Sequence, residues 1–93
     1  DGIIASSEPA ALGTLYALKR AGMRVPQDVK IVSFDSTLYS LLTDPPLTSI
    51  ERNPQRIAQK SCELILQMMH GETPAGNQFY IPTNLVERAS TDG

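Results

Sequence analysis

Short apolar runs alternate with helical patterns along the sequence. Residues 3–6 form an apolar run that is followed at once by a helix start, which favours a buried strand. Residues 29–34 are rich in β-branched and aromatic side chains, and residues 47–50 follow a pair of prolines that ends the segment before them. Each is predicted to be a strand, and two further short strands are predicted at residues 78–81 and 85–88.

Helical patterns occupy the segments between the first strands. Ser7 can cap a first helix whose apolar face contains Ala11, Leu15 and Leu18 at helical spacing. One or two helical turns are predicted at residues 38–42. The sequence therefore predicts a strand, a tight turn and a helix, followed by a second strand and a short helix.

The clearest element of the sequence is a third helix. Asn53 is predicted to cap it, a proline takes its first position, and Gly71 is placed where a C-terminal glycine is common. Apolar residues recur between these ends at spacings of three and four. Cys62, Met68 and Met69 are predicted to fill a core beneath this helix.

The order of these elements predicts the fold class. Strands that alternate with helices through short connections imply parallel β-α units with right-handed crossovers, so the expected class is α/β. Residues 72–77 are predicted to form a polar loop and residues 90–93 a frayed end. In open sheets of this kind a ligand binds beyond the carboxyl ends of the strands.

Polar side chains follow all three of the first strands. They are Ser7 and Glu8 after the first, Asp35, Ser36 and Thr37 after the second, and Glu51 and Arg52 after the third. Carboxylates accept hydrogen bonds from hydroxyl groups and an arginine donates several, so this set suits a sugar or another polyol. We select Ser7, Asp35 and Arg52 as candidate binding residues.

Each candidate also has a purely structural interpretation. Ser7 can serve only as a helix cap, and Asp35 can be a turn residue whose side chain folds onto its neighbours. Arg52 can pair in solvent with Glu51 or Glu63, which would contribute little.

Composition limits the classes of function. The 93 residues, 41% of them hydrophobic, allow one small globular unit, and the net charge of −2 comes with basic residues scattered from Lys19 to Arg88. Nothing in this distribution attracts nucleic acid by itself. Cys62 is the only cysteine, so an intramolecular disulfide and a cysteine metal cluster are excluded. We expect no cofactor, no membrane span and a cytoplasmic location.

An enzyme is poorly supported by the motifs. A hydrolase would use Ser7, and a metal-dependent phosphoryl transferase would use Asp35, Glu8 and Glu51. The sequence has no G-x-S-x-G elbow, no glycine-rich phosphate loop and no pair of residues at metal-ligand spacing. His70 also lies in the wrong part of the chain to act as a base, so we expect no catalytic and no metal-binding residue.

Five segments together resemble the lactose-repressor family of bacterial transcription regulators. They are residues 1–8 (DGIIASSE), 22–29 (GMRVPQDV), 32–35 (VSFD), 44–50 (DPPLTSI) and 85–90 (LVERAS). Their order and spacing are more specific than any one of them alone. The resemblance covers essentially the whole sequence and implies a lobe with a parallel sheet, from a two-lobed periplasmic-binding-protein-like domain of type I.

The resemblance also implies roles for the candidate residues. Asp35 stands at the family's ligand-binding aspartate, Ser7 at an effector-contacting asparagine and Arg52 at a pocket-facing polar position. Glu8 and Ser33 depart from the family's usual aspartate and glycine, which leaves the identity of the effector open. A sugar or sugar phosphate is the effector class that the resemblance implies.

A homodimer is implied as well. Leu12, Leu38, Tyr39 and Leu42 match positions near the family's dimer contact, although core packing is an alternative use for them. Residues 1–93 are then the C-terminal portion of an effector-binding domain, and operator DNA is bound by a helix-turn-helix domain outside this sequence. Effector binding between the two lobes would then change their closure, and this change would alter how the dimer presents its helix-turn-helix domains to the operator.

A periplasmic or extracellular sugar-binding protein of an uptake system is the alternative function, because it shares the fold. Residues 45–48 and 85–90 resemble the repressor branch rather than the transport branch. This difference favours the repressor.

Overall fold

A computed structural model describes residues 1–76 and 78–93. The chain divides into two units, of which the first comprises Asp1–Glu51 and Asn84–Gly93 and the second comprises Arg52–Thr83. No helix among the described residues has the length and apolar character needed to cross a membrane.

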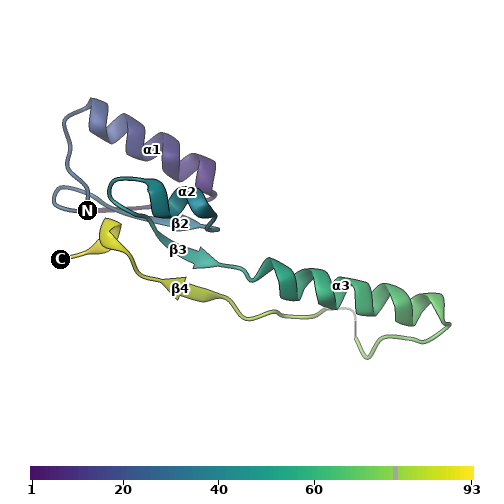
Figure 1. Cartoon of the computed structure of the whole chain (residues 1–93). Coiled ribbons are helices and arrows are strands. Elements are labelled where there is room, and N and C mark those ends of the chain that lie inside the picture. The colour runs from purple at the N-terminus through teal and green to yellow at the C-terminus, as the bar shows by residue number, and fades with distance from the viewer. Residues whose placement is uncertain (77) are drawn as a thin grey trace. The chain divides into compact units, whose positions relative to one another are not determined.

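The first unit is built on one four-stranded sheet (Figure 1). Its strands are β1 (Gly2–Ala5), β2 (Lys30–Phe34), β3 (Thr48–Glu51) and β4 (Asn84–Val86), and they lie side by side in that order. β1 pairs with β2 and β2 with β3 in parallel, as the sequence predicts. β4 pairs with β3 in the antiparallel direction and forms one edge of the sheet.

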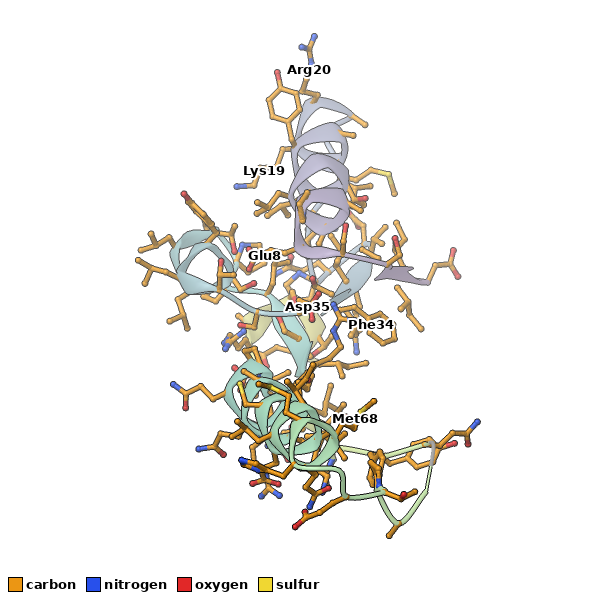
Figure 2. All side chains as sticks on the ribbon, turned by 90° about the vertical axis from the view of Figure 1, so that its right-hand side faces the viewer. Glu8, Lys19, Arg20, Phe34, Asp35 and Met68 are labelled. Atoms are coloured by element: carbon orange, nitrogen blue, oxygen red, sulfur yellow. The ribbon has the colours of Figure 1, made fainter. Side chains whose placement is uncertain are left out.

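Two helices connect the parallel strands. In α1 (Glu8–Arg20) the Ser7 hydroxyl accepts a hydrogen bond from the Ala10 N–H at 3.3 Å, which confirms the predicted cap. Figure 2 shows Glu8 at the end of α1 that lies near Asp35, whereas Lys19 and Arg20 lie at the opposite end of the helix. This distribution of charge complements the helix dipole. α2 (Leu38–Leu42) spans the five residues predicted for it.

The core of the first unit is small and lies where α1 contacts the sheet. It consists of Ala5, Ala11, Leu15, Ile31 and Leu47, with Leu12, Leu18 and Val25 packed against it. The predicted apolar face of α1 is thereby confirmed, because Ala11 and Leu15 point into this core.

The prediction of a frayed end at residues 90–93 is wrong at Ser90 and Thr91, which belong to a short helical element. A 3-10 helix, η1 (Ala89–Thr91), places the Ser90 side chain at 0% exposure. The Ser90 hydroxyl donates to the Ile31 carbonyl at 2.6 Å and accepts from the Thr48 N–H at 2.8 Å. These contacts reach across 59 and 42 residues of sequence, which local composition does not reveal.

The second unit contains one long helix, α3 (Pro54–Met69). Asn53 is the N-cap residue and a proline follows it at the first helical position, as predicted, but Asn53 has a left-handed conformation, with φ 56°, and its side chain makes no capping hydrogen bond. Gly71 has φ +78° just beyond the helix, as a C-terminal glycine should. The helix and its end are therefore confirmed, and the start differs in detail.

No residue of α3 is buried, so the prediction that its cysteine and methionines fill a core is wrong. Cys62 is exposed, and Met68 and Met69 are 63% and 75% exposed. The spacing of apolar residues predicted the helix correctly, but it carries no information about what covers the apolar face.

Residues 78–81 do not form the predicted strand. They lie beside α3, where the Lys60 ammonium is 4.9 Å from the centre of the Phe79 ring. The described part of the second unit contains no strand that could pair with them. Residues 72–76 form a loop as predicted, and residue 77 of that predicted loop lies outside the described residues.

Candidate ligand-binding site

The carboxyl ends of the three parallel strands meet at one edge of the sheet in the first unit. Ala5 is aligned with Ser33, and Phe34 with Ile50. Ser7 lies two residues beyond Ala5, and Asp35 lies two residues beyond Ser33, the partner of Ala5. The structure therefore brings these two candidates to the ends of neighbouring strands. Their contact with a ligand stays a prediction.

Asp35 has an unusual backbone conformation. Its φ of 69° lies in the left-handed region, which costs energy for a residue with a Cβ. The Asp35 N–H donates to the Ile50 carbonyl at 2.9 Å. The buried Ser33 hydroxyl donates to the Phe34 carbonyl at 3.0 Å, immediately before this turn. The half-buried Asp35 is thus held by the strands on which it stands.

Glu8 is not available to a ligand in the way that its place at a strand end suggested. Its side chain is 6% exposed, and the carboxylate accepts bonds from the Thr37 N–H at 2.7 Å and the Thr37 hydroxyl at 2.6 Å. The Ser40 hydroxyl adds a third bond at 2.6 Å. Burial alone would raise the pKa of Glu8, but these hydrogen bonds lower it below its usual value. Glu8 is therefore a link between α1 and the start of α2.

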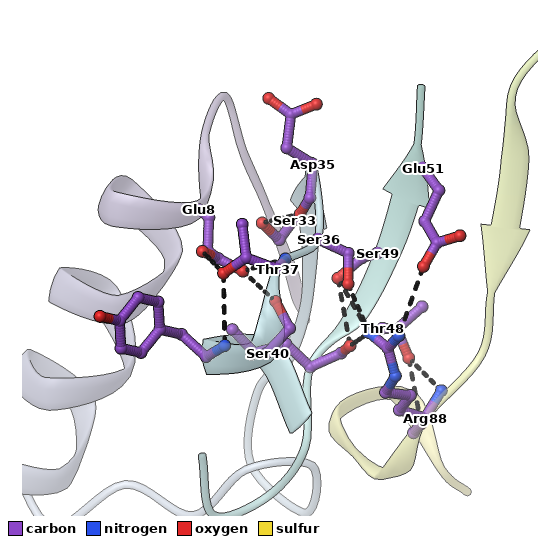
Figure 3. Close-up of polar contacts among 12 residues, drawn as sticks. Glu8, Ser33, Asp35, Ser36, Thr37, Ser40, Thr48, Ser49, Glu51 and Arg88 are labelled. Carbon is purple, nitrogen blue, oxygen red and sulfur yellow. Dashed lines mark hydrogen bonds and ion pairs between the residues drawn. The ribbon is translucent and has the colours of Figure 1, made fainter. Parts of the chain in front are cut away.

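Arg88 was not among the residues predicted from the sequence to form the site. Its guanidinium donates to the Leu47 carbonyl at 2.6 Å, to the Ser36 hydroxyl at 3.2 Å and to the Ser49 hydroxyl at 3.3 Å (Figure 3). A second nitrogen lies 3.6 Å from Glu51, and the side chain is only 13% exposed. The match of residues 85–90 to a known family was the one signal for this position, and it indicated no role.

Arg52 is the first residue of the second unit. Two ion pairs in the structure use the acidic residues that were considered as its partners: Glu51 pairs with Arg88, and Glu63 lies 3.8 Å from Lys60. The role of Arg52 in the pocket stays a prediction.

The residues selected for a dimer contact differ in exposure. Leu38, Tyr39 and Leu42 are 66%, 63% and 70% exposed, whereas Leu12 packs against the core. Core packing within this chain therefore accounts for Leu12 and not for the three residues of α2. Among the described residues no group of three histidine, cysteine or acidic side chains comes together as a metal site would require.

The sequence matches the periplasmic binding protein-like domain family over residues 1–91, and the chain belongs to that family. The fold confirms the predicted α/β class and the sheet of mainly parallel strands.

Among curated proteins, the lactose operon repressor of Escherichia coli K12 is 34% identical over 89 residues, which is 96% of this chain and 24% of the repressor. The chain spans about a quarter of the length of the curated relatives it matches. These relatives are repressors and regulators of the lactose-repressor type, so the resemblance seen in the sequence is confirmed.

Two solved structures show the same similarity. A periplasmic binding protein/LacI transcriptional regulator from Alkaliphilus metalliredigens QYMF, complexed with D-xylulofuranose, is 31% identical with a TM-score of 0.92 and covers 100% of this chain and 35% of its own. The Lac repressor dimer bound to operator and an anti-inducer is 33% identical with a TM-score of 0.89. That match covers 97% of this chain and 27% of the repressor chain.

Proposed function

We propose that this chain is the effector-binding and dimerisation region of a sugar-responsive transcription repressor. Residues 1–93 then form the C-terminal portion of the effector domain, and a helix-turn-helix domain elsewhere in the protein binds the operator. The observation that carries this proposal is the placement of Asp35, whose backbone N–H is bonded to the Ile50 carbonyl, at the carboxyl end of β2 beside the end of β1 that bears Ser7.

The chemistry of this edge suits a sugar. An ionised aspartate accepts two hydroxyl hydrogen bonds, and the Ser7 hydroxyl can donate while it also caps α1. Arg52 would supply further donors. The complex of the Alkaliphilus relative with D-xylulofuranose supports a sugar, and a sugar phosphate is a second effector class that Arg52 could serve.

Calorimetric titration of the full-length protein tests this proposal. The panel is lactose, cellobiose, D-xylulose and D-ribose with their phosphorylated forms, and Ser7→Ala and Arg52→Ala are compared with the unaltered protein. We expect one panel member to bind and both substitutions to weaken it. Absence of binding by every panel member would refute a sugar effector.

We also propose that α2 contributes to a homodimer. Leu38, Tyr39 and Leu42 expose apolar surface on a short helix, and such surface on a regulator is commonly an interface. A relative, the Lac repressor, is a dimer in its complex with operator, which supports a dimer here. Leu12 would flank the contact from α1.

Sedimentation of the full-length protein tests the dimer. Leu42→Asp places a charge in the proposed contact and should shift the protein towards monomer, because burying an unpaired carboxylate is costly. Met23→Asp, at an exposed apolar residue in the α1–β2 connection, is the matched control and should leave the dimer intact. Equal sedimentation of wild type and Leu42→Asp would rule out this interface.

The proposal makes the chain a regulator rather than an enzyme, and it places the protein in the cytoplasm with the DNA. Its relatives are transcription regulators, which disfavours the uptake-system alternative. A gel shift tests whether DNA is bound by a domain outside residues 1–93. The full-length protein should retard operator DNA, whereas residues 1–93 alone should not.

A further inference from the structure

We propose that Glu8 and Arg88 are positioning residues that clamp the Asp35 turn from two sides. The contacts that form the clamp are features of the structure, and their effect on a ligand rests on the function proposed above. Neither residue needs to touch the sugar. They act through Ser36 and Thr37, the two residues that follow Asp35.

The first side of the clamp comes from α1. The Glu8 carboxylate accepts hydrogen bonds from the Thr37 N–H at 2.7 Å and from the Thr37 hydroxyl at 2.6 Å. It accepts a third from the Ser40 hydroxyl at 2.6 Å. All three are charge-assisted bonds to a carboxylate of 6% exposure, which makes them short and strong. The Thr37 hydroxyl also caps α2 through the Tyr39 N–H at 3.3 Å. Glu8 therefore fixes the point at which the turn enters α2.

The second side comes from the segment after β4. Arg88 donates to the Ser36 hydroxyl at 3.2 Å across 52 residues of sequence. The guanidinium is itself fixed, because it also donates to the Leu47 carbonyl and pairs with Glu51. A planar group held at several points makes a rigid anchor. Ser36 is therefore tied to the middle of the sheet and Thr37 to α1.

Asp35 lies at the start of this tethered segment in a strained conformation. Figure 3 shows its carboxylate pointing away from both Glu8 and Arg88, so the anchors hold the backbone while the charged group faces elsewhere. The left-handed conformation is disfavoured by about tenfold for a residue with a Cβ. Release of either anchor should let Asp35 relax. The apparent Kd then rises in inverse proportion to the fraction of molecules that keep the binding-competent conformation.

Amide hydrogen exchange in the full-length protein tests the clamp without any ligand. The readout is the Asp35 amide, because neither substitution removes its acceptor, the Ile50 carbonyl. Glu8→Ala and Arg88→Met should each speed Asp35 exchange about tenfold relative to the Val32 amide of the same variant.

Two controls separate positioning from general loss of stability. Leu15→Ala removes a core side chain from the same helix as Glu8, and Arg24→Met removes a surface arginine that pairs with Asp28 at 3.0 Å. In both controls the ratio of Asp35 to Val32 exchange should stay at its wild-type value. An unchanged ratio in Glu8→Ala and Arg88→Met, or the same change in Leu15→Ala, would overturn the clamp.

Titration with the panel sugar that wild type binds tests the consequence. Glu8→Ala and Arg88→Met should raise Kd about tenfold, and Arg24→Met should leave it unchanged. Faster Asp35 exchange with an unaltered Kd would overturn the positioning role. If no panel sugar binds wild type, the proposed function fails, and the exchange ratio still decides whether the clamp exists.

Discussion

Ser90 provides a sharp test of how the first unit is held together. Its hydroxyl bridges the Ile31 carbonyl of β2 and the Thr48 N–H of β3, and the side chain is completely buried. Ser90→Ala removes both bonds at a position with no exposure to solvent. The change tests whether this hydroxyl anchors the end of the sequence to two neighbouring strands.

The size of the effect follows from the two partners. A buried N–H that loses its acceptor costs about 1–3 kcal/mol, and loss of one bond to a carbonyl costs about 1 kcal/mol. We therefore expect Ser90→Ala to lower the free energy of unfolding by about 2–4 kcal/mol. This is a large share of the stability of a small unit.

Urea denaturation of the full-length protein, followed by circular dichroism, measures the change. Thr14→Ala is the matched control, because the Thr14 hydroxyl bonds the Ala10 carbonyl within α1 at 2.8 Å and that carbonyl lies in the helical ladder. The control should change stability by less than about 0.5 kcal/mol. A loss for Ser90→Ala no larger than that of the control would show that the Ser90 hydroxyl does not anchor the end of the sequence to these two strands.

Three further predictions concern acid, the core and a turn. Burial alone would raise the pKa of Glu8, but hydrogen bonds from Ser40 and Thr37 hold it below its usual value, so the contribution of Glu8 to stability is present above the usual pKa and is lost as pH falls through the lowered one. Urea denaturation repeated from neutral pH into acid should therefore show a smaller acid loss of stability in Glu8→Gln than in wild type. Leu15→Ala should lower the free energy of unfolding by about 2–5 kcal/mol in urea, since Leu15 is 4% exposed. Gly22→Ala should cost about 1 kcal/mol, seen as a lower Tm, because φ is +74° although the space around it is open.

Local patterns in the sequence were enough to predict most of the first unit. Helical spacing placed Ala11 and Leu15 in the core, and the serine before α1 proved to be its cap. The parallel pairing of β1, β2 and β3 followed from their alternation with helices. These features depend on contacts between residues that are close in sequence or on rules of connection.

Contacts over long sequence distances were not predictable in the same way. The bond from Arg88 to Ser36 spans 52 residues, and nothing near either residue indicates it. Glu8 was expected to face a ligand because it follows a strand, yet its hydrogen-bond partners lie 29 and 32 residues further along. The candidate site was therefore predicted at its centre, Asp35, and not in the residues that support it.

Calorimetric titration of the full-length protein and its Asp35→Ala variant with the sugar panel tests whether Asp35 anchors an effector pocket. Asp92→Ala, an exposed aspartate outside the strand ends, is the matched control. We predict that one sugar binds and that Asp35→Ala weakens it by about 2 kcal/mol or more, roughly thirtyfold in Kd, with Asp92→Ala unchanged. Equal binding of that sugar by wild type and Asp35→Ala would contradict a pocket anchored by Asp35.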